Sequence, residues 1–386
     1  MKTRIFKVRF ILATIVLSFG LMASVFAKNI EESENSYKDV VTHLNELIES
    51  TPSFKCDIVA ALRSQDNCSY YWDSKDIKYF LTFFEEWLVY NPVPWDGAKY
   101  IQPFDELANS EGGTILFNNN IFSSWFISFL DARGDYLKTE ESLTKEILKD
   151  WKQFNGINLG QYKPYKYTGP KEKRYENYKS FNDVFLREFV APVKIASPKK
   201  NDVLVSPAAG KIHQIYVDDL TTEFEVKKDI INIRQALNNS KYAEKFIGGK
   251  MVDVLLWFTD YHHFHSPVAG TLVEMNGYAG SYNYNFKNVD WYKELAKHKR
   301  FCYIIETEDF GLVAMIPVGF WGVGSIESIV KEGQVVEKGQ KIGNFGFGGS
   351  SILLIFEPGK IDFSLENIEK DWVQIKVGEE IGRVPK

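Results

Sequence analysis

The hydrophobic pattern changes its period once along the chain, and this change sets the class of fold. From residue 28 to about residue 169, apolar residues recur at spacings of three and four, as in amphipathic helices. The runs at 40–48, 77–90 and 143–148 show this spacing best. Pro92 and Pro94, and later Gly112 and Gly113, interrupt the pattern and divide the region into helical pairs. We expect its many aromatic residues to form a core.

Beyond about residue 170 the pattern becomes that of a β-protein. Residues 160–174 have no period, so we place a linker there and a domain boundary between 170 and 171. Residues 180–189 predict one amphipathic helix. Short β-branched and aromatic runs bounded by Gly and Pro follow, at 202–205, 252–258, 303–307, 312–318 and 352–356. The sequence therefore predicts an α+β protein, with a mostly helical N-terminal region at 28–170 and a β-rich catalytic core at 171–386.

The first 27 residues have the composition of a secretory signal peptide. Residues 1–9 carry four cations and no acid, residues 10–26 are apolar, and Val25-Phe26-Ala27 resembles a cleavage site. We expect an exported protein. The alternative is an uncleaved membrane anchor at residues 10–26, although 17 residues are at the short limit of what spans a bilayer. Export would permit a disulfide between Cys56 and Cys68, whereas Cys302 lies in an apolar run and is expected to be a buried, inert thiol.

The net negative charge of the chain makes some classes of binding partner unfavourable. The chain has 46 Lys and Arg against 51 Asp and Glu, and its net charge is −5. An acidic protein of this kind is a poor ligand for nucleic acids. Peripheral contact with a membrane and formation of oligomers remain open. No GxGxxG or GxxxxGK[ST] sequence occurs, so nothing indicates a nucleotide-binding fold.

Three short segments carry polar residues that a purely structural β-domain does not need. They read SPAAGKI at 206–212, DYHHFHSPVAG at 260–270, and GNFGFGGSSILLIFE at 343–357. In the third, Ser350 follows two glycines and precedes an apolar strand. Such a turn by itself is most often a hairpin, but a serine there can act as a nucleophile if a histidine removes its proton. On a strand, His263 and His265 would share one side and His262 would face the other.

These segments resemble the phosphatidylserine decarboxylases and related pyruvoyl-dependent decarboxylases over residues 181–363. The matching family motifs are an F-N-D-F-F-like helix, S-P-A-D-G-K, D-Y-H-R-x-H-x-P-x-x-G and G-x-F-x-x-G-S-T. The resemblance implies a proenzyme that cleaves itself between Gly349 and Ser350. It implies a β chain of residues 28–349, an α chain of residues 350–386, and a pyruvoyl group made from Ser350. That ketone would condense with a substrate amine and accept the electrons released as carbon dioxide leaves.

The resemblance also implies roles for two histidines. His265 would be the base that activates Ser350, and His262 would help to bind the substrate or protonate the carbanion. His263 stands where the family has Arg. Ser351 replaces the Thr of the cleavage motif and keeps a hydroxyl group.

The main departure from the family is Ala209, which stands in place of the Asp of S-P-A-D-G. By analogy with Ser-His-Asp sites, that Asp holds the histidine tautomer and stabilises the imidazolium. Asp260 and Asp253 are the candidate substitute acids by their proximity in sequence.

Several functions remain open on this basis. We expect conversion of phosphatidylserine to phosphatidylethanolamine. The alternatives are a soluble decarboxylase of free aromatic amino acids, which some relatives with an additional helical region are, and a non-catalytic secreted protein that binds lipid or a partner. A zinc endopeptidase could use His263-x-His265, but the upstream His213 and Asp218 are spaced by five residues rather than four, so we expect no metal.

Overall fold

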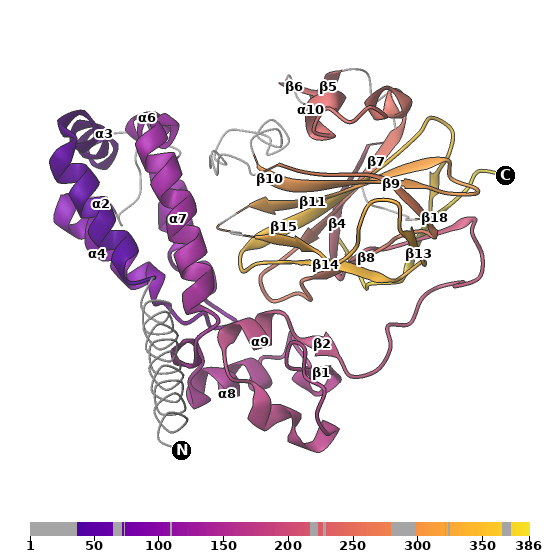
Figure 1. The fold of residues 1–386 in the computed structure, drawn as a ribbon, viewed down its shortest axis with the longest axis horizontal. Helices are drawn as coiled ribbons and strands as arrows, with labels where there is room; N and C mark the ends of the chain where they lie inside the picture. The colour runs from indigo at the N-terminus through magenta and orange to yellow at the C-terminus, as the bar shows by residue number, and fades with distance from the viewer. Residues whose placement is uncertain are drawn as a thin grey trace, which may run out of the picture.

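The computed structural model describes residues 37–64, 72, 74–108, 110–216, 223–226, 229–278, 298–320, 322, 325–364 and 372–386. The predicted signal peptide, the alternative anchor at residues 10–26 and Cys68 lie outside these ranges. Among the described residues, no helix has the length and apolar character needed to cross a membrane. The chain forms a helical region followed by a β-rich core, which confirms the predicted α+β class (Figure 1).

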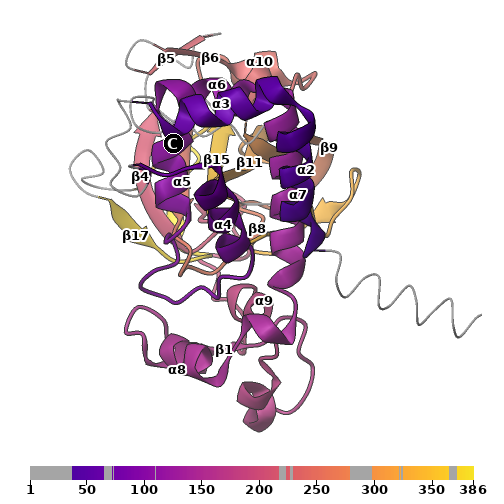
Figure 2. The same cartoon turned by 90° about the vertical axis from the view of Figure 1, so that its left-hand side faces the viewer.

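The helical region occupies one side of the molecule, in front of the β-rich core in the view of Figure 2. Its helices are α2 (Asp39–Ser50), α3 (Pro52–Leu62), α4 (Ile77–Leu88), α5 (Ile101–Ala108), α6 (Glu111–Asn118), α7 (Asn120–Tyr136) and α8 (Lys145–Gln153), with the 3-10 turn η1 (Glu140–Ser142). Aromatic side chains join these helices, as predicted. Phe84 of α4 is fully buried, and its ring lies 4.8 Å from that of Trp125 and 5.1 Å from that of Phe129, both on α7.

The break between helices that we predicted at Gly112 and Gly113 lies slightly earlier, between the end of α5 at Ala108 and the start of α6 at Glu111. Both glycines are in the first turn of α6, after Ser110, whose side chain accepts a hydrogen bond from the Gly113 amide. A β-carbon at Gly112 would lie 2.5 Å from the carbonyl oxygen of Ala60 on α3. These glycines therefore allow two helices to approach closely and do not end one.

A series of short elements connects the two parts. They are η2 (Leu159–Gln161), β1 (Tyr162–Lys163), η3 (Lys171–Asn177), α9 (Phe181–Phe185) and β2 (Glu188–Phe189), and β1 pairs with β2. The single helix predicted for residues 180–189 is wrong in its second half. Ser180 and Asp183 form a capping box at the start of α9, but the helix ends at Phe185 because Arg187 turns away to bind carbonyl groups of another segment.

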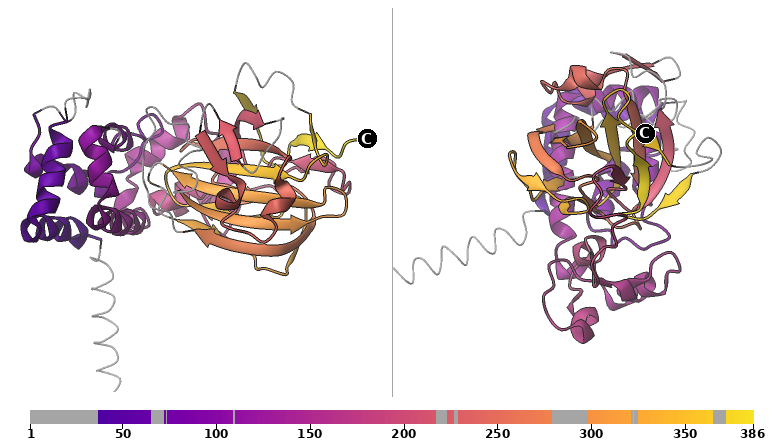
Figure 3. Two further views of the ribbon diagram at one scale, coloured as in Figure 1. Left: turned by 90° about the horizontal axis from the view of Figure 1, so that it is seen from above. Right: turned by 90° about the vertical axis from the view of Figure 1, so that its right-hand side faces the viewer.

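The β-rich core consists of one large antiparallel sheet and smaller sheets packed on it (Figure 3). The large sheet has the order β13-β9-β10-β11-β15-β7-β4-β17. Its strands are β4 (Gly210–Tyr216), β7 (Lys250–Leu256), β9 (Gly270–Tyr278), β10 (Lys299–Glu306), β11 (Leu312–Phe320), β13 (Val335–Val336), β15 (Gly349–Phe356) and β17 (Val373–Ile375).

Each face of the large sheet buries a separate cluster of apolar side chains. On one face lie the small sheets β12 (Ile326–Ser328), β14 (Lys341–Phe345) and β8 (His263–His265), and β16 (Asp362–Phe363), β18 (Glu380–Arg383) and β3 (Val203–Val205). The opposite face is covered by α10 (Ile233–Ala236) and η4 (Ala243–Phe246), beside the hairpin of β5 (Glu223–Val226) and β6 (Asp229–Asn232). We call these the inner face and the outer face; Ile352 and Leu354 of β15 point to the inner one, Leu353 and Ile355 to the outer one.

Candidate active site

Ser350 lies at the start of β15, within a paired strand. It is opposite Gly319 of β11 on one side and Leu256 of β7 on the other. The preceding Gly348 has a φ of 147°, which a residue with a side chain rarely adopts, so the turn into the strand requires glycine. Ser350 is fully buried, and its hydroxyl group has no hydrogen-bond partner among the residues that the structure describes. A buried polar group without a partner is costly, and such groups mark functional sites.

The neighbouring Ser351 has the opposite environment. By strand alternation Ser350 points to the inner face and Ser351 to the outer face. The Ser351 hydroxyl donates a hydrogen bond to the carboxylate of Asp253 on β7, and both residues are fully buried. Asp253 was one predicted substitute for the missing acid. The structure places it on the side of the sheet away from the Ser350 side chain, where it holds Ser351.

His262 is a buried imidazole with one open nitrogen. Its Nδ1 lies 3.0 Å from the carbonyl oxygen of Asp260, so Nδ1 carries the hydrogen and Nε2 keeps a lone pair. That Nε2 is buried and has no partner in the described part of the chain. The ring stacks on Phe185 of α9 at 4.0 Å. Burial, and then the charge of Arg187, lower the pKa of His262 to about 3, so the ring is neutral at pH 7.

The chain brings His262 towards Ser350 by two short paths. The carbonyl oxygen of His262 accepts a hydrogen bond from the amide of Phe345, five residues before Ser350. Leu256, which pairs with Ser350, is six residues before His262. Phe185, against which His262 stacks, also contacts Phe347, with ring centres 5.1 Å apart.

His265, the predicted base, has partners on both ring nitrogens. Its Nδ1 donates to the carbonyl oxygen of Gly339 at 2.8 Å, and its Nε2 lies 3.2 Å from the hydroxyl group of Tyr261. Burial lowers its pKa to about 4. His263 and His265 share one side of β8, as predicted, while Phe264 between them points into the inner-face cluster.

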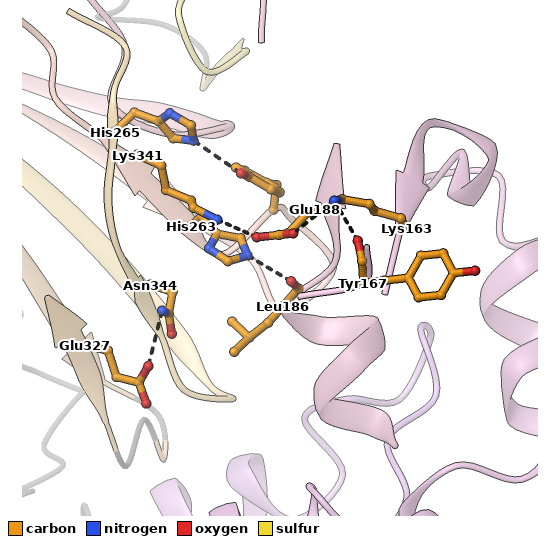
Figure 4. A network of polar contacts seen from close by, with 10 residues as sticks. Lys163, Tyr167, Leu186, Glu188, His263, His265, Glu327, Lys341 and Asn344 are labelled. Atoms are coloured by element: carbon orange, nitrogen blue, oxygen red, sulfur yellow. Dashed lines mark hydrogen bonds and ion pairs between the residues drawn. The ribbon is translucent and has the colours of Figure 1, made fainter. Parts of the chain in front are cut away.

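Figure 4 shows the polar network around these two histidines. His263 donates from Nε2 to the carbonyl oxygen of Leu186 at 2.8 Å. Lys341 forms an ion pair with Glu188, which also lies 3.6 Å from Lys163. Burial alone would raise the pKa of Glu188, but the hydrogen bond and charge of Lys341 lower it. Lys341 thus supplies a cation beside the position where the family has Arg and this chain has His263.

Arg187 is a functional candidate that sequence reasoning missed. It is buried, and its guanidinium donates to the carbonyl oxygens of Thr259 at 2.7 Å and Asp260 at 3.0 Å. The Asp260 carbonyl therefore accepts from both Arg187 and His262. A cation inside the apolar run Val184-Phe185-Leu186-Arg187 was the signal for it.

The two remaining predicted positions have clear surroundings. The Asp260 carboxylate accepts a hydrogen bond from the Trp257 amide at 2.7 Å, and burial raises its pKa to about 6. Ala209 lies two residues after Pro207, and the carbonyl oxygen of Pro207 accepts a hydrogen bond from the His265 amide at 2.8 Å. The methyl group of Ala209 cannot form a hydrogen bond with an imidazole.

Among the described residues, no cluster of His, Cys, Asp and Glu could hold a metal ion, and Asp218 of the zinc alternative lies outside them. Cys302 is buried and its pKa is raised to about 12 by burial. Cys56 is exposed and pairs with no cysteine among the described residues, and Cys68, its predicted disulfide partner, lies outside them.

Comparison with known proteins agrees with this arrangement. The sequence model for phosphatidylserine decarboxylase matches residues 181–383. The phosphatidylserine decarboxylase proenzyme of Fusobacterium nucleatum is 31% identical over 290 residues, which are 73% of this chain and 89% of that protein. A proenzyme of Clostridium tetani is 28% identical over 295 residues, 72% of this chain and 94% of that protein. A second proenzyme of rice is 32% identical over 274 residues, or 70% of this chain, but only 42% of the rice protein is covered. The chain belongs to the phosphatidylserine decarboxylase family.

Proposed function

We propose that this chain is a self-cleaving, pyruvoyl-dependent decarboxylase that converts phosphatidylserine to phosphatidylethanolamine. The main support is the Ser350 hydroxyl, which is fully buried in the cleavage motif and makes no hydrogen bond to the described residues. Most buried polar groups in proteins have a partner, so this hydroxyl group is a candidate for a functional role. Family membership supports the reaction class, and the proenzyme names of the relatives support two chains from one precursor.

In the proposed maturation, the Ser350 oxygen attacks the Gly349 carbonyl and displaces the amide nitrogen, so that an ester replaces the peptide bond. Removal of the Ser350 α-proton then expels the Gly349 carboxylate and leaves dehydroalanine, which water converts to a pyruvoyl group and ammonia. The products would be a β chain that ends at Gly349 and an α chain of 37 residues, 350–386. The pyruvoyl group supplies an electron sink for decarboxylation of an amine-bearing substrate.

The protein's own hydrogen bonds favour His262 over His265 as the base that takes the proton of Ser350. The Nε2 atom of His262 has no partner among the described residues, whereas both nitrogens of His265 are occupied. His263 also has an open Nδ1, but its ring lies in the network of Lys341 and Glu188. The family resemblance gives this role to His265 and gives substrate contact to His262. The two assignments differ in which histidine variant stops cleavage and which stops only turnover.

Purified wild type, Ser350→Ala, His262→Ala and His265→Ala test these assignments on denaturing gels and by intact mass. We expect a pyruvoyl-ended fragment of residues 350–386 from the wild type and no cleavage of Ser350→Ala. Under our assignment His262→Ala also stays uncut, while His265→Ala matures. Cutting of Ser350→Ala would eliminate the proposed nucleophile, and an uncut wild type would favour a non-catalytic binding protein.

Carbon dioxide release decides the substrate. Phosphatidylserine vesicles are compared with free L-tryptophan and L-tyrosine, because a free aromatic amino acid is the alternative substrate within the family. We also propose that the protein is exported, with residues 1–27 removed. Mass analysis of the N-terminus of protein recovered from the native host tests this: a chain that begins near residue 28 is expected, and one that retains residues 10–26 would indicate an anchor.

A further inference from the structure

A cavity of ≈ 490 Å³ lies between the helical region and the cleavage motif. One wall is the C-terminal half of α7 with the turn that follows it, and it includes Asp131 and Gly134 of the helix and Lys138 of the turn. The facing wall includes Asn344 of β14 and Phe347, which precedes Ser350 by three residues. The volume is in the range of small-molecule sites in proteins. The helical region, which the family match at 181–383 does not include, therefore forms part of a cavity beside the cleavage motif.

Gly134 is the residue of α7 that most needs an explanation. Glycine within a helix is less favourable than alanine. Elsewhere in this chain helical glycines allow close packing, as at Gly112, where a β-carbon would lie 2.5 Å from a carbonyl oxygen of α3. A β-carbon at Gly134 would meet no atom within 4 Å. Close packing therefore does not require this glycine, and a larger side chain at residue 134 would extend into the cavity.

The cavity is separated from the reactive residues by two aromatic rings. Phe185 and Phe347 line it, and their ring centres are 5.1 Å apart. The ring of His262 stacks on Phe185. Phe347 lies in the segment that would become the free C-terminal end of the β chain after cleavage at Gly349. Cleavage would release this segment from β15, which gives the cavity a route to residue 350.

The charged groups around the cavity are of both signs. Asp131 and Asp135 of α7 and Glu327 of β12 are acidic, and Arg133, Lys138 and Lys166 are basic. Asp135 and Lys138 form an exposed ion pair at 2.9 Å. Apolar side chains, among them Leu130, Leu137 and Phe181, form the rest of the lining. A site of this character suits a substrate that carries an ammonium group and a carboxylate together, with an apolar part beside them.

We propose that this cavity binds the amino acid part of the substrate, and that α7 of the helical region determines how large that part can be. The inference rests on the proposed decarboxylase function. The same α-amino carboxylate occurs in the serine headgroup of a phospholipid and in a free amino acid. In both cases the amine must reach residue 350 through the space beside Gly134.

The test fills the space without touching the cleavage motif. Full-length wild type, Gly134→Ala, Gly134→Phe and the control Ser128→Phe are compared; Ser128 is an exposed α7 residue that does not line the cavity. Self-cleavage is followed by intact mass. Carbon dioxide release is measured against concentration with phosphatidylserine vesicles diluted in phosphatidylcholine, and separately with free L-serine, L-tryptophan and L-tyrosine.

We expect all four proteins to cleave themselves. Gly134→Phe should raise KM by about tenfold or more for whichever source the wild type uses, Gly134→Ala should raise it less, and Ser128→Phe should leave it unchanged. An unchanged KM in Gly134→Phe overturns the inference, and so does loss of its self-cleavage, which would give residue 134 a role in maturation. A wild type that releases no carbon dioxide from either source instead refutes the proposed function, and the inference fails with it.

Discussion

Two adjacent serines of β15 differ in their hydrogen bonds, and this difference predicts the effect of removing the second one. Ser350 and Ser351 are both fully buried. The Ser350 hydroxyl has no partner among the described residues, so its loss removes none of their hydrogen bonds. The Ser351 hydroxyl donates to the Asp253 carboxylate, and the Val254 carbonyl oxygen lies 3.3 Å from it. Ser350→Ala is therefore a suitable uncut background in which to measure Ser351.

The expected magnitude follows from burial. A hydrogen bond to a charged group contributes about 1.5–3 kcal/mol, and a buried charge that loses a donor is left less well solvated. Asp253 is fully buried on β7 and keeps its other contacts. We expect Ser350→Ala/Ser351→Ala to be less stable than Ser350→Ala by about 2 kcal/mol in this part of the sheet. Ser350→Ala/Ser351→Thr keeps the hydroxyl group and should lose about 0.5 kcal/mol or less.

Hydrogen exchange of peptides that cover β7 and β15 is the appropriate assay. The chain has a helical region and a β-rich core, so a single free energy of unfolding is not well defined, whereas exchange reports the opening of one segment. Protection should fall in these two strands and remain unchanged in α4 and α7. Equal protection of the two uncut proteins would refute the argument that Asp253 depends on Ser351.

Two further predictions concern the histidines. Thermal stability should fall as the pH drops from about 6.5 towards 4, because burial lowers the pKa of His262, His263 and His265 and only the unfolded chain takes up protons in that range. Burial raises the pKa of Asp260, Asp131 and Asp183, which acts in the opposite sense, and the lowered pKa of Glu188 acts in the same sense as the histidines. Lys341→Gln should raise the pKa of His263 and Glu188→Gln should lower it, as measured by NMR titration of the ring; shifts of the same sign would contradict the electrostatic account.

Much of the fold could be predicted from periodicity because each part of the chain keeps one period. The apolar residues of α2 and α4 recur every three or four positions, and those of β15 form a continuous run that is buried on both faces. The end of α9 could not be predicted in this way. Residues 180–189 have a helical pattern, but the helix stops at Phe185 because Arg187 finds carbonyl acceptors in a segment 72 residues later. The cation at Arg187 is a local signal, but its acceptors lie far away in the sequence and cannot be identified from it.

The sequence predicted which residues form the candidate site better than it predicted the contacts between them. The motifs led to Ser350 and to the histidine cluster. Asp253 contacts Ser351 and not Ser350 because its side chain points to the outer face of the sheet. The face to which it points relative to Ser350 follows from the pairing of β7 with β15, which the sequence alone does not show. The cavity beside Gly134 was out of reach of the sequence, because it is formed by two parts of the chain that no shared motif connects.

Because Ala209 replaces the Asp of the family, the site lacks a charge that would stabilise an imidazolium, whereas the orientation of the histidine rings is less affected. Each histidine of the cluster donates one ring N–H to a main-chain carbonyl, from His262 to Asp260 and from His265 to Gly339, so no carboxylate is needed to select the tautomer. A carbonyl carries only a partial negative charge, and the imidazolium formed when a base takes the Ser350 proton is less stabilised than it would be beside a carboxylate. Arg187, which donates to the same Asp260 carbonyl, disfavours that imidazolium further at His262. A low barrier to proton transfer is therefore not built into this site. We expect self-cleavage to be slow, and the wild-type time course of the 37-residue fragment measures it.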